Sequence, residues 1–146
     1  MADHFDDYDA VNSPQHYNCP FKVKPPTCDF FFSLMPSHLA NAFKYTWRAG
    51  RKPGVPMRLD LRKAIESLRL WSDVDLGWAA IAGAGQAYPN QLYLQHAYVE
   101  LLSDETEDVT EQWRMYALEA IVFGATERAR DILEEKLVEV MRNETV

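Results

Sequence analysis

The fold of this chain is decided by residues 37–71, which read SHLANAFKYTWRAGRKPGVPMRLDLRKAIESLRLW. Apolar side chains recur at helical spacing on both sides of a loop that holds two prolines and a glycine between residues 51 and 56. They are Leu39, Ala42, Phe43 and Trp47 before the loop, and Leu61, Ile65 and Leu68 after it. Gly50 stands where a glycine commonly ends a helix, so we expect helices over 39–49 and 58–71. Two helices joined by a short loop predict a helical hairpin.

The segment before the hairpin is shaped by proline. Five prolines between Val11 and Pro36 exclude a long helix before Thr27, so we expect a loop or a short extended segment there. The apolar run 28–35 fits either a buried helical turn or a short strand, and its pattern does not decide between them. Ser37 directly follows Pro36 and has a side chain suited to a helix N-cap.

The segment after the hairpin reads as further helices. Its periodicity predicts helices over 90–102, 109–123 and 126–142, and a weaker helix is expected over 75–89. The inward side chains of the second and third are expected to be Trp113, Tyr116, Ala117, Ala120, Ile121, Ala129, Ile132, Leu133, Leu137 and Val140. No segment alternates long enough to predict a sheet strand. The predicted fold class is therefore all-α: a helical hairpin core over about 37–72, preceded by a proline-rich loop and followed by a C-terminal helical bundle.

The net charge of −7 conceals an uneven distribution. The charge is −4 over residues 1–21, +7 over residues 22–71 and −10 over residues 72–146. We therefore divide the chain into a flexible acidic tail, a basic hairpin region and an acidic helical region, with a boundary near Asp73. Their ranges are 1–10, 11–72 and 73–146. A net acidic protein disfavours an anionic ligand, but a basic block within it can attract one.

The composition also predicts where the protein acts and what it binds. No stretch resembles a targeting signal or approaches the roughly 18 to 20 apolar residues of a membrane span, so we expect a soluble, cytoplasmic protein. Cys19 and Cys28 lack the spacing of a zinc site, so we expect free thiols and no metal. The aromatic residues follow helical spacing, which is typical of a core, so we expect no nucleic-acid partner. The apolar stretch from Ile81 to Tyr88 is a candidate interface for a homo-oligomer.

A second, polar and basic face of the hairpin is the most informative feature. It comprises Asn41, Lys44, Tyr45, Arg48, Arg51, Lys52 and Lys63. Several cations with an amide and a phenol among them suit an oxyanion such as a phosphate. The alternative is an ordinary solvated helix face, and the residues alone leave both open. His16 and Tyr17 stand in a proline-bounded loop, a common location for functional residues, although a single histidine is often only structural.

Other motifs that hold phosphates or metals are missing from the sequence. It contains neither a GxxxxGK[ST] loop nor an HExxH pair. The spacing of Glu134, Glu135 and Glu139 could ligate magnesium, but no companion ExxD element lies in another predicted helix. We interpret these glutamates as a solvated acidic face, and no motif implies a magnesium site.

Three blocks of the sequence resemble the motifs of a small phage family. VNSPQHY (11–17), NAFKYTWRAGRK (41–52) and DLRKA (60–64) are similar to its N-x-P-x-H-Y, N-x-x-K-Y-x-x-R and D-L-x-K-A motifs. The family includes the early nucleotide kinase of short-tailed coliphages, which phosphorylates deoxynucleoside monophosphates without a Walker A loop. The resemblance covers about residues 11–72 and implies a phage protein that handles nucleotides in the host cytoplasm. It carries over to His16, Tyr17, Asn41, Lys44, Tyr45, Arg48 and Lys63.

Residue pattern and resemblance together predict a nucleotide pocket between the hairpin and the His16 loop. The residues expected to neutralise or orient the phosphates are Tyr17, Asn41, Lys44, Tyr45, Arg48, Arg51 and Lys63. His16 and Asp60 are the candidate catalytic residues, as groups that could accept or shuttle a proton. The predicted function is nucleotide binding with a nucleoside monophosphate kinase-like activity, for which ATP would be the phosphoryl donor. Two alternatives stay open: a non-catalytic protein that sequesters nucleotides or cyclic nucleotides against host defence, and a host-takeover protein that binds a host protein through its acidic helices.

Overall fold

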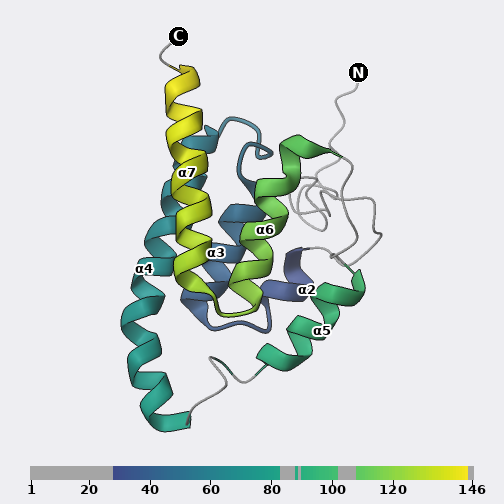
Figure 1. Cartoon of the computed structure of the whole chain (residues 1–146), viewed down its shortest axis with the longest axis vertical. Coiled ribbons are helices and arrows are strands. Elements are labelled where there is room, and N and C mark those ends of the chain that lie inside the picture. The colour runs from purple at the N-terminus through teal and green to yellow at the C-terminus, as the bar shows by residue number, and fades with distance from the viewer. Residues whose placement is uncertain (1–27, 83–87, 89, 102–107, 145–146) are drawn as a thin grey trace.

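The computed structural model describes residues 28–82, 88, 90–101 and 108–144, and every regular element within these ranges is a helix (Figure 1). In chain order the elements are α2 (Cys28–Phe32), α3 (Ser37–Arg48), α4 (Met57–Ala82), α5 (Gln91–Leu101), the short 3₁₀ helix η2 (Val109–Glu111), α6 (Gln112–Val122) and α7 (Thr126–Glu144). The all-α class predicted from the sequence is confirmed. Within the described ranges, no helix combines the length and apolar character needed to cross a membrane.

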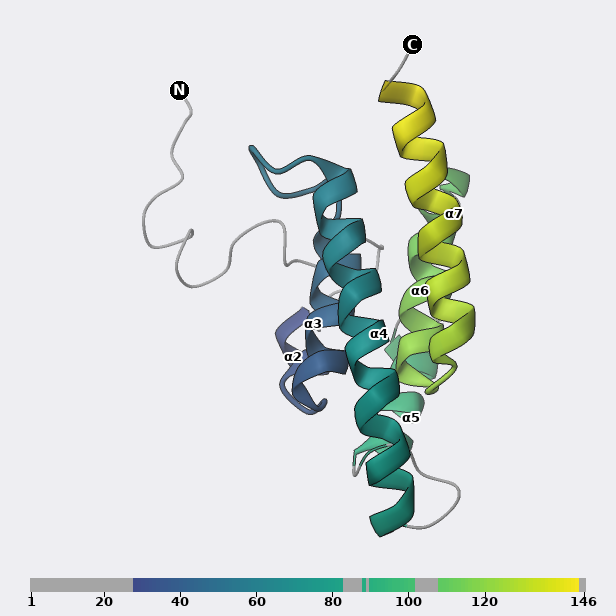
Figure 2. The same ribbon diagram turned by 90° about the vertical axis from the view of Figure 1, so that its left-hand side faces the viewer.

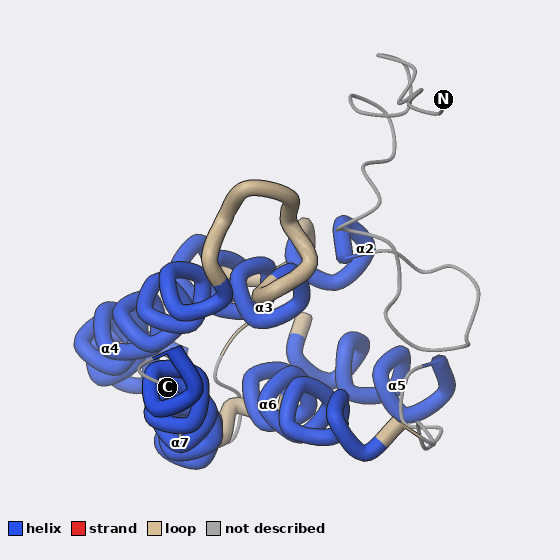
Figure 3. The backbone as a smooth tube through the Cα atoms, turned by 90° about the horizontal axis from the view of Figure 1, so that it is seen from above, coloured by secondary structure: helices blue, strands red, loops and turns tan. Residues whose placement is uncertain are grey.

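The helices pack in two layers, which Figure 3 shows from above. One layer holds α2, α3 and α4, and the other holds α5, α6 and α7. α4 and α7 run side by side in opposite directions (Figure 2), and Arg58 near the start of α4 donates to Glu144 at the end of α7 at 3.0 Å. α3 packs against α4 in its own layer and against α6 in the other layer. The predicted hairpin therefore stands against the C-terminal helices.

The α3–α4 hairpin buries the apolar stripe that the sequence predicts. Leu39, Phe43 and Trp47 have no exposed surface, and neither does Leu61 on α4. Phe31 from α2 packs on Phe43 and Trp47, with ring centroids 5.3 Å and 6.3 Å away. The apolar run 28–35 fitted either a helical turn or a strand, and its first five residues form the short helix α2. The ring of Phe31 completes the aromatic core.

α4 is longer than predicted, because it continues to Ala82 instead of ending near Trp71. The charge of the sequence changes near Asp73, but none of the residues 72–76 is a proline or glycine that would break a helix. The core also contains residues from both sides of this position, among them Trp71 and Leu118. The basic and acidic regions predicted from charge therefore share one hydrophobic core.

Two local predictions are wrong. Ser37 is the first residue of α3 rather than its N-cap; Pro36 occupies the cap position, and no side chain caps the helix there. Tyr116 is 43% exposed rather than inward, because Met115 and Leu118 fill the inward face of α6 beside the predicted alanines.

The predicted oligomer interface lies mostly outside the described residues, which exclude 83–87. Tyr88 at its end is buried against the chain's own helix α6, since its hydroxyl donates to the carbonyl of Val122 at 2.9 Å. Burial raises the pKa of this phenol. The predicted acidic tail over 1–10 and Cys19 also lie outside the described residues.

Candidate functional site

The connection between α3 and α4 runs over residues 49–56 and begins with a tight turn at Gly50. This residue has a φ of +77°, in the left-handed region that suits glycine, and the amide of Arg51 donates to the carbonyl of Arg48 at 2.7 Å. A Cβ atom at Gly50 would lie 3.2 Å from the Sδ atom of Met57, so a larger residue would also crowd this side chain. α4 begins at Met57, directly after Pro56. The turn places the end of α3 beside the start of α4.

Three cations gather around the ring of Tyr45. The Nζ atom of Lys44 lies 4.9 Å from the ring centroid, and the guanidinium carbon of Arg48 lies 4.8 Å from it. The Nζ atom of Lys63 approaches the same ring from α4, at 5.4 Å. We call Lys44, Tyr45, Arg48 and Lys63 the Tyr45 cluster. Two helices thus bring together four residues that the sequence singled out.

Arg48 and Asp60 form a buried ion pair. Arg48 Nη2 donates to Asp60 Oδ1 at 3.0 Å, and Arg48 Nε lies 3.3 Å and 3.2 Å from the two carboxylate oxygens. The side chain of Asp60 is fully buried and that of Arg48 is 7% exposed. This contact accounts for both side chains without a ligand, because it neutralises each charge and joins α3 to α4. The roles of Arg48 in phosphate binding and of Asp60 in proton transfer stay predictions.

The two lysines of the Tyr45 cluster are not neutralised in the same way. In the part of the chain that the structure describes, neither Lys44 nor Lys63 forms an ion pair, and their close contacts are with the Tyr45 ring. Lys63 is exposed and Lys44 is half-buried. Among the residues that the structure describes, the three cations of the cluster are paired with one carboxylate, that of Asp60 on Arg48. A bound anion would reduce the repulsion among these like charges.

The remaining predicted residues lie near the cluster or outside the described residues. Asn41 is half-buried one turn before Tyr45 on α3, and Arg51 is half-buried in the turn. His16 and Tyr17 lie in the N-terminal part of the chain that the structure does not describe. Their contact with the hairpin stays a prediction.

The charges of this region affect the pKa of the buried Cys28 thiol. Burial raises its pKa, and the charge of Asp29 raises it further. The cations that oppose this shift are Lys44, Arg51 and Arg48. The positive charges of the turn and of α3 therefore act on the same point in the structure.

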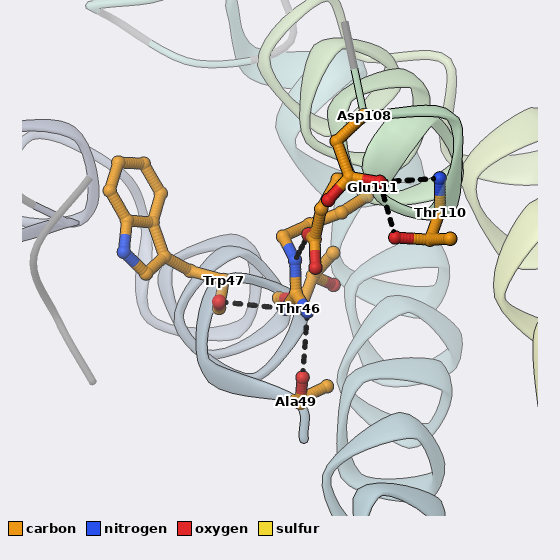
Figure 4. Close-up of polar contacts among 7 residues, drawn as sticks. Thr46, Trp47, Ala49, Asp108, Thr110 and Glu111 are labelled. Carbon is orange, nitrogen blue, oxygen red and sulfur yellow. Dashed lines mark hydrogen bonds and ion pairs between the residues drawn. The ribbon is translucent and has the colours of Figure 1, made fainter. Parts of the chain in front are cut away.

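The main feature that the sequence analysis missed is Arg114, on α6. Its side chain is almost fully buried and donates to three main-chain carbonyls at the end of α3: Thr46 at 2.7 Å, Trp47 at 2.8 Å and Ala49 at 2.8 Å. Its Nε atom binds the carboxylate of Glu111 at 2.6 Å. Figure 4 labels the partners of Arg114 at the end of α3, which are Thr46, Trp47 and Ala49, together with Glu111.

The short helix η2 places Glu111 for this contact. Asp108 caps η2 by accepting from the amide of Thr110 at 3.0 Å (Figure 4). The hydrogen bond from the Thr110 side chain, and then the one from its amide, hold the pKa of Asp108 below its usual range. The sequence did indicate that Arg114 is buried, because it lies one turn before Ala117 and Leu118 on the apolar face of α6. We call Arg114 together with its three carbonyl acceptors the Arg114 clamp.

A shallow acidic hollow lies elsewhere, on the exposed face of α7. It is lined by Asp131, Glu134, Glu135, Val138, Glu139 and Arg142. Two of these glutamates are partly neutralised on α7 itself, since Glu134 lies 3.7 Å from Arg130 and Glu139 lies 3.0 Å from Lys136. Among the described residues, no group of three or more His, Cys, Asp or Glu side chains is placed to hold a metal ion.

Comparison of the chain with protein-family models, with curated proteins and with solved structures finds no match. The candidate site therefore rests on its own residues and contacts.

Proposed function

We propose that this protein binds the phosphate groups of a nucleotide, with a deoxynucleotide as the expected ligand, at the Tyr45 cluster. The observation that carries the proposal is the convergence of three cations on one aromatic ring, with one carboxylate among them. That carboxylate, on Asp60, is buried and already paired with Arg48. The ammonium groups of Lys44 and Lys63 are therefore the charges available to an anion.

The chemistry of the two lysines suits a phosphate. An ammonium group is a compact charge with three donors, and it binds phosphate oxygens without the fixed geometry that a guanidinium requires. Lys44 comes from α3 and Lys63 from α4, so a phosphate between them would contact both helices of the hairpin. The ring of Tyr45 holds both ammonium groups near this position before the ligand arrives, which lowers the entropic cost of binding.

The motif resemblance supports the same residues. Lys44, Tyr45 and Arg48 belong to the block that resembles N-x-x-K-Y-x-x-R, and Lys63 belongs to the block that resembles D-L-x-K-A. The contacts of the fold and the motif resemblance thus concern the same four side chains. We place the nucleotide function in this cluster for that reason.

Substitution of the two lysines tests the proposal. We expect each deoxynucleoside monophosphate that binds to raise the melting temperature of the wild-type protein, because it binds the folded state. Lys44→Ala and Lys63→Ala are each expected to weaken binding by about tenfold, which corresponds to the loss of one charge-assisted hydrogen bond. Titration calorimetry of the same variants measures the affinities directly.

Arg69→Ala is the matched control for this experiment. It removes one positive charge from α4, but Arg69 lies outside the cluster and is paired with Glu66 at 2.6 Å on the surface. Its affinity for the nucleotide should stay at the wild-type value. The proposal fails if no nucleotide shifts the melting temperature of the wild type, or if all three variants lose affinity equally.

Phosphoryl transfer is a finer form of this proposal and rests on the motif resemblance. Incubation of the protein with ATP and each deoxynucleoside monophosphate, with and without magnesium, separates turnover from capture. Formation of a deoxynucleoside diphosphate would identify a kinase. Recovery of the bound nucleotide unchanged after the protein is heated would identify a sequestering protein.

A further inference from the structure

The Tyr45 cluster lies at an end of α3 that should repel an anion. The carbonyl groups of the last turn of a helix give its C-terminus about half a negative charge. Arg48 is the last residue of α3, so three members of the cluster, Lys44, Tyr45 and Arg48, lie at this end of the helix, and Lys63 joins them from α4. An anion bound here needs a nearby positive charge that cancels the field of the helix end.

Arg114 supplies such a charge from the other layer of the fold. Its guanidinium donates to the carbonyls of Thr46, Trp47 and Ala49, which are among those that carry the negative end of α3. It is almost fully buried, so water screens its charge weakly. The contact also fixes the residues immediately before Gly50, where the chain turns from α3 toward α4.

We infer that Arg114 is a positioning residue for the phosphate site, acting through the last turn of α3 without touching the ligand. This inference rests on the proposed function. Arg114 neutralises the end of α3 and fixes the turn that carries Arg51, while Lys44 and Lys63 make the contacts with phosphate. The acidic C-terminal helices thereby contribute a positive charge to a site formed by the basic hairpin.

Two substitutions with opposite expected effects test this role. Arg114→Gln removes the charge but keeps a hydrogen-bond donor, and we expect binding to weaken by roughly fivefold. Glu111→Gln removes the carboxylate that partly neutralises Arg114, and we expect binding to strengthen by roughly twofold. Both substitutions break one ion pair, so a purely structural role predicts weaker or unchanged binding for both. Affinities are measured by calorimetry with inorganic pyrophosphate and with each deoxynucleoside monophosphate, well below the melting temperature of each variant.

Two controls complete the experiment. Glu119→Gln removes a carboxylate about 12 Å further along α6, where it should leave affinity unchanged. Leu118→Ala destabilises the core of α6 without changing any charge, and its affinity should also equal that of the wild type. If Arg114→Gln does not fold, the tighter binding expected of Glu111→Gln decides the question alone.

The outcomes separate this inference from the proposed function. A wild-type protein that binds neither pyrophosphate nor any nucleotide overturns both. A wild type that binds, with Arg114→Gln or Glu111→Gln at wild-type affinity, overturns only the role of Arg114. Loss of affinity in Leu118→Ala to the same degree as in Arg114→Gln would also overturn it, because the effect would then follow stability rather than charge.

Discussion

Substitution of Asp60 by asparagine is expected to lower the free energy of unfolding by about 3 to 5 kcal/mol. The side chain of Asp60 is fully buried and accepts from both Nε and Nη2 of Arg48, which is itself almost buried. Asparagine keeps the shape but removes the negative charge, so the guanidinium would stay buried without its counter-charge. Urea-induced unfolding, followed by far-UV circular dichroism, measures the loss.

Two further variants show whether the ion pair causes this effect. Glu66→Gln removes the carboxylate of an exposed pair on the same helix, and its unfolding curve should match that of the wild type. The double variant Arg48→Met/Asp60→Leu replaces both charges by apolar groups and should be more stable than Asp60→Asn alone. An Asp60→Asn protein that unfolds at the wild-type urea concentration would show that the pair does not hold the hairpin together.

Substitution of Arg114 by alanine is expected to lower the free energy of unfolding by about 3 kcal/mol. The change removes three charge-assisted hydrogen bonds to the end of α3 and leaves those carbonyls without their partner. The contact also joins the two layers, since Arg114 belongs to α6 and the carbonyl groups that accept its hydrogen bonds lie at the end of α3. Chemical denaturation of the alanine variant measures the effect, and hydrogen exchange at residues 49–52 should become faster.

Arg58→Ala provides the comparison for Arg114. It removes an arginine that also joins two helices through its ion pair with Glu144. The side chains of this pair are exposed, Arg58 by 42% and Glu144 by 41%. Such a pair contributes between about 0 and 1 kcal/mol. Equal losses in Arg58→Ala and Arg114→Ala would contradict the importance of the buried clamp.

Much of the fold could be predicted from the sequence because helical periodicity is a local property. The apolar stripes of residues 37–71 face the core as expected, and Gly50 ends α3 in the left-handed conformation. The length of α4 could not be read from charge. The change from basic to acidic residues near Asp73 alters what the helix surface attracts, but the backbone there has no residue that breaks a helix.

The candidate site was predictable only in part. The spacing of Lys44, Tyr45 and Arg48 on one helix indicated a common face, and Lys63, which the sequence also indicated, reaches the same ring from α4. A sequence does not show which charges neutralise one another, and the buried pairing of Arg48 with Asp60 depends on the packing of two helices. The clamp formed by Arg114 depends on contacts between residues more than 60 positions apart, which no local pattern encodes.

The measurement that tests the central claim most directly is a two-dimensional amide NMR titration of the full chain with a deoxynucleoside monophosphate. The proposal predicts that the largest shift changes fall on the second half of α3, on residues 49–56 and on the first two turns of α4, where the Tyr45 cluster lies. The signals of the exposed face of α7 should stay in place. A titration that leaves the α3–α4 turn unchanged, or that moves mainly signals of α5 or α7, would contradict a nucleotide site at this cluster.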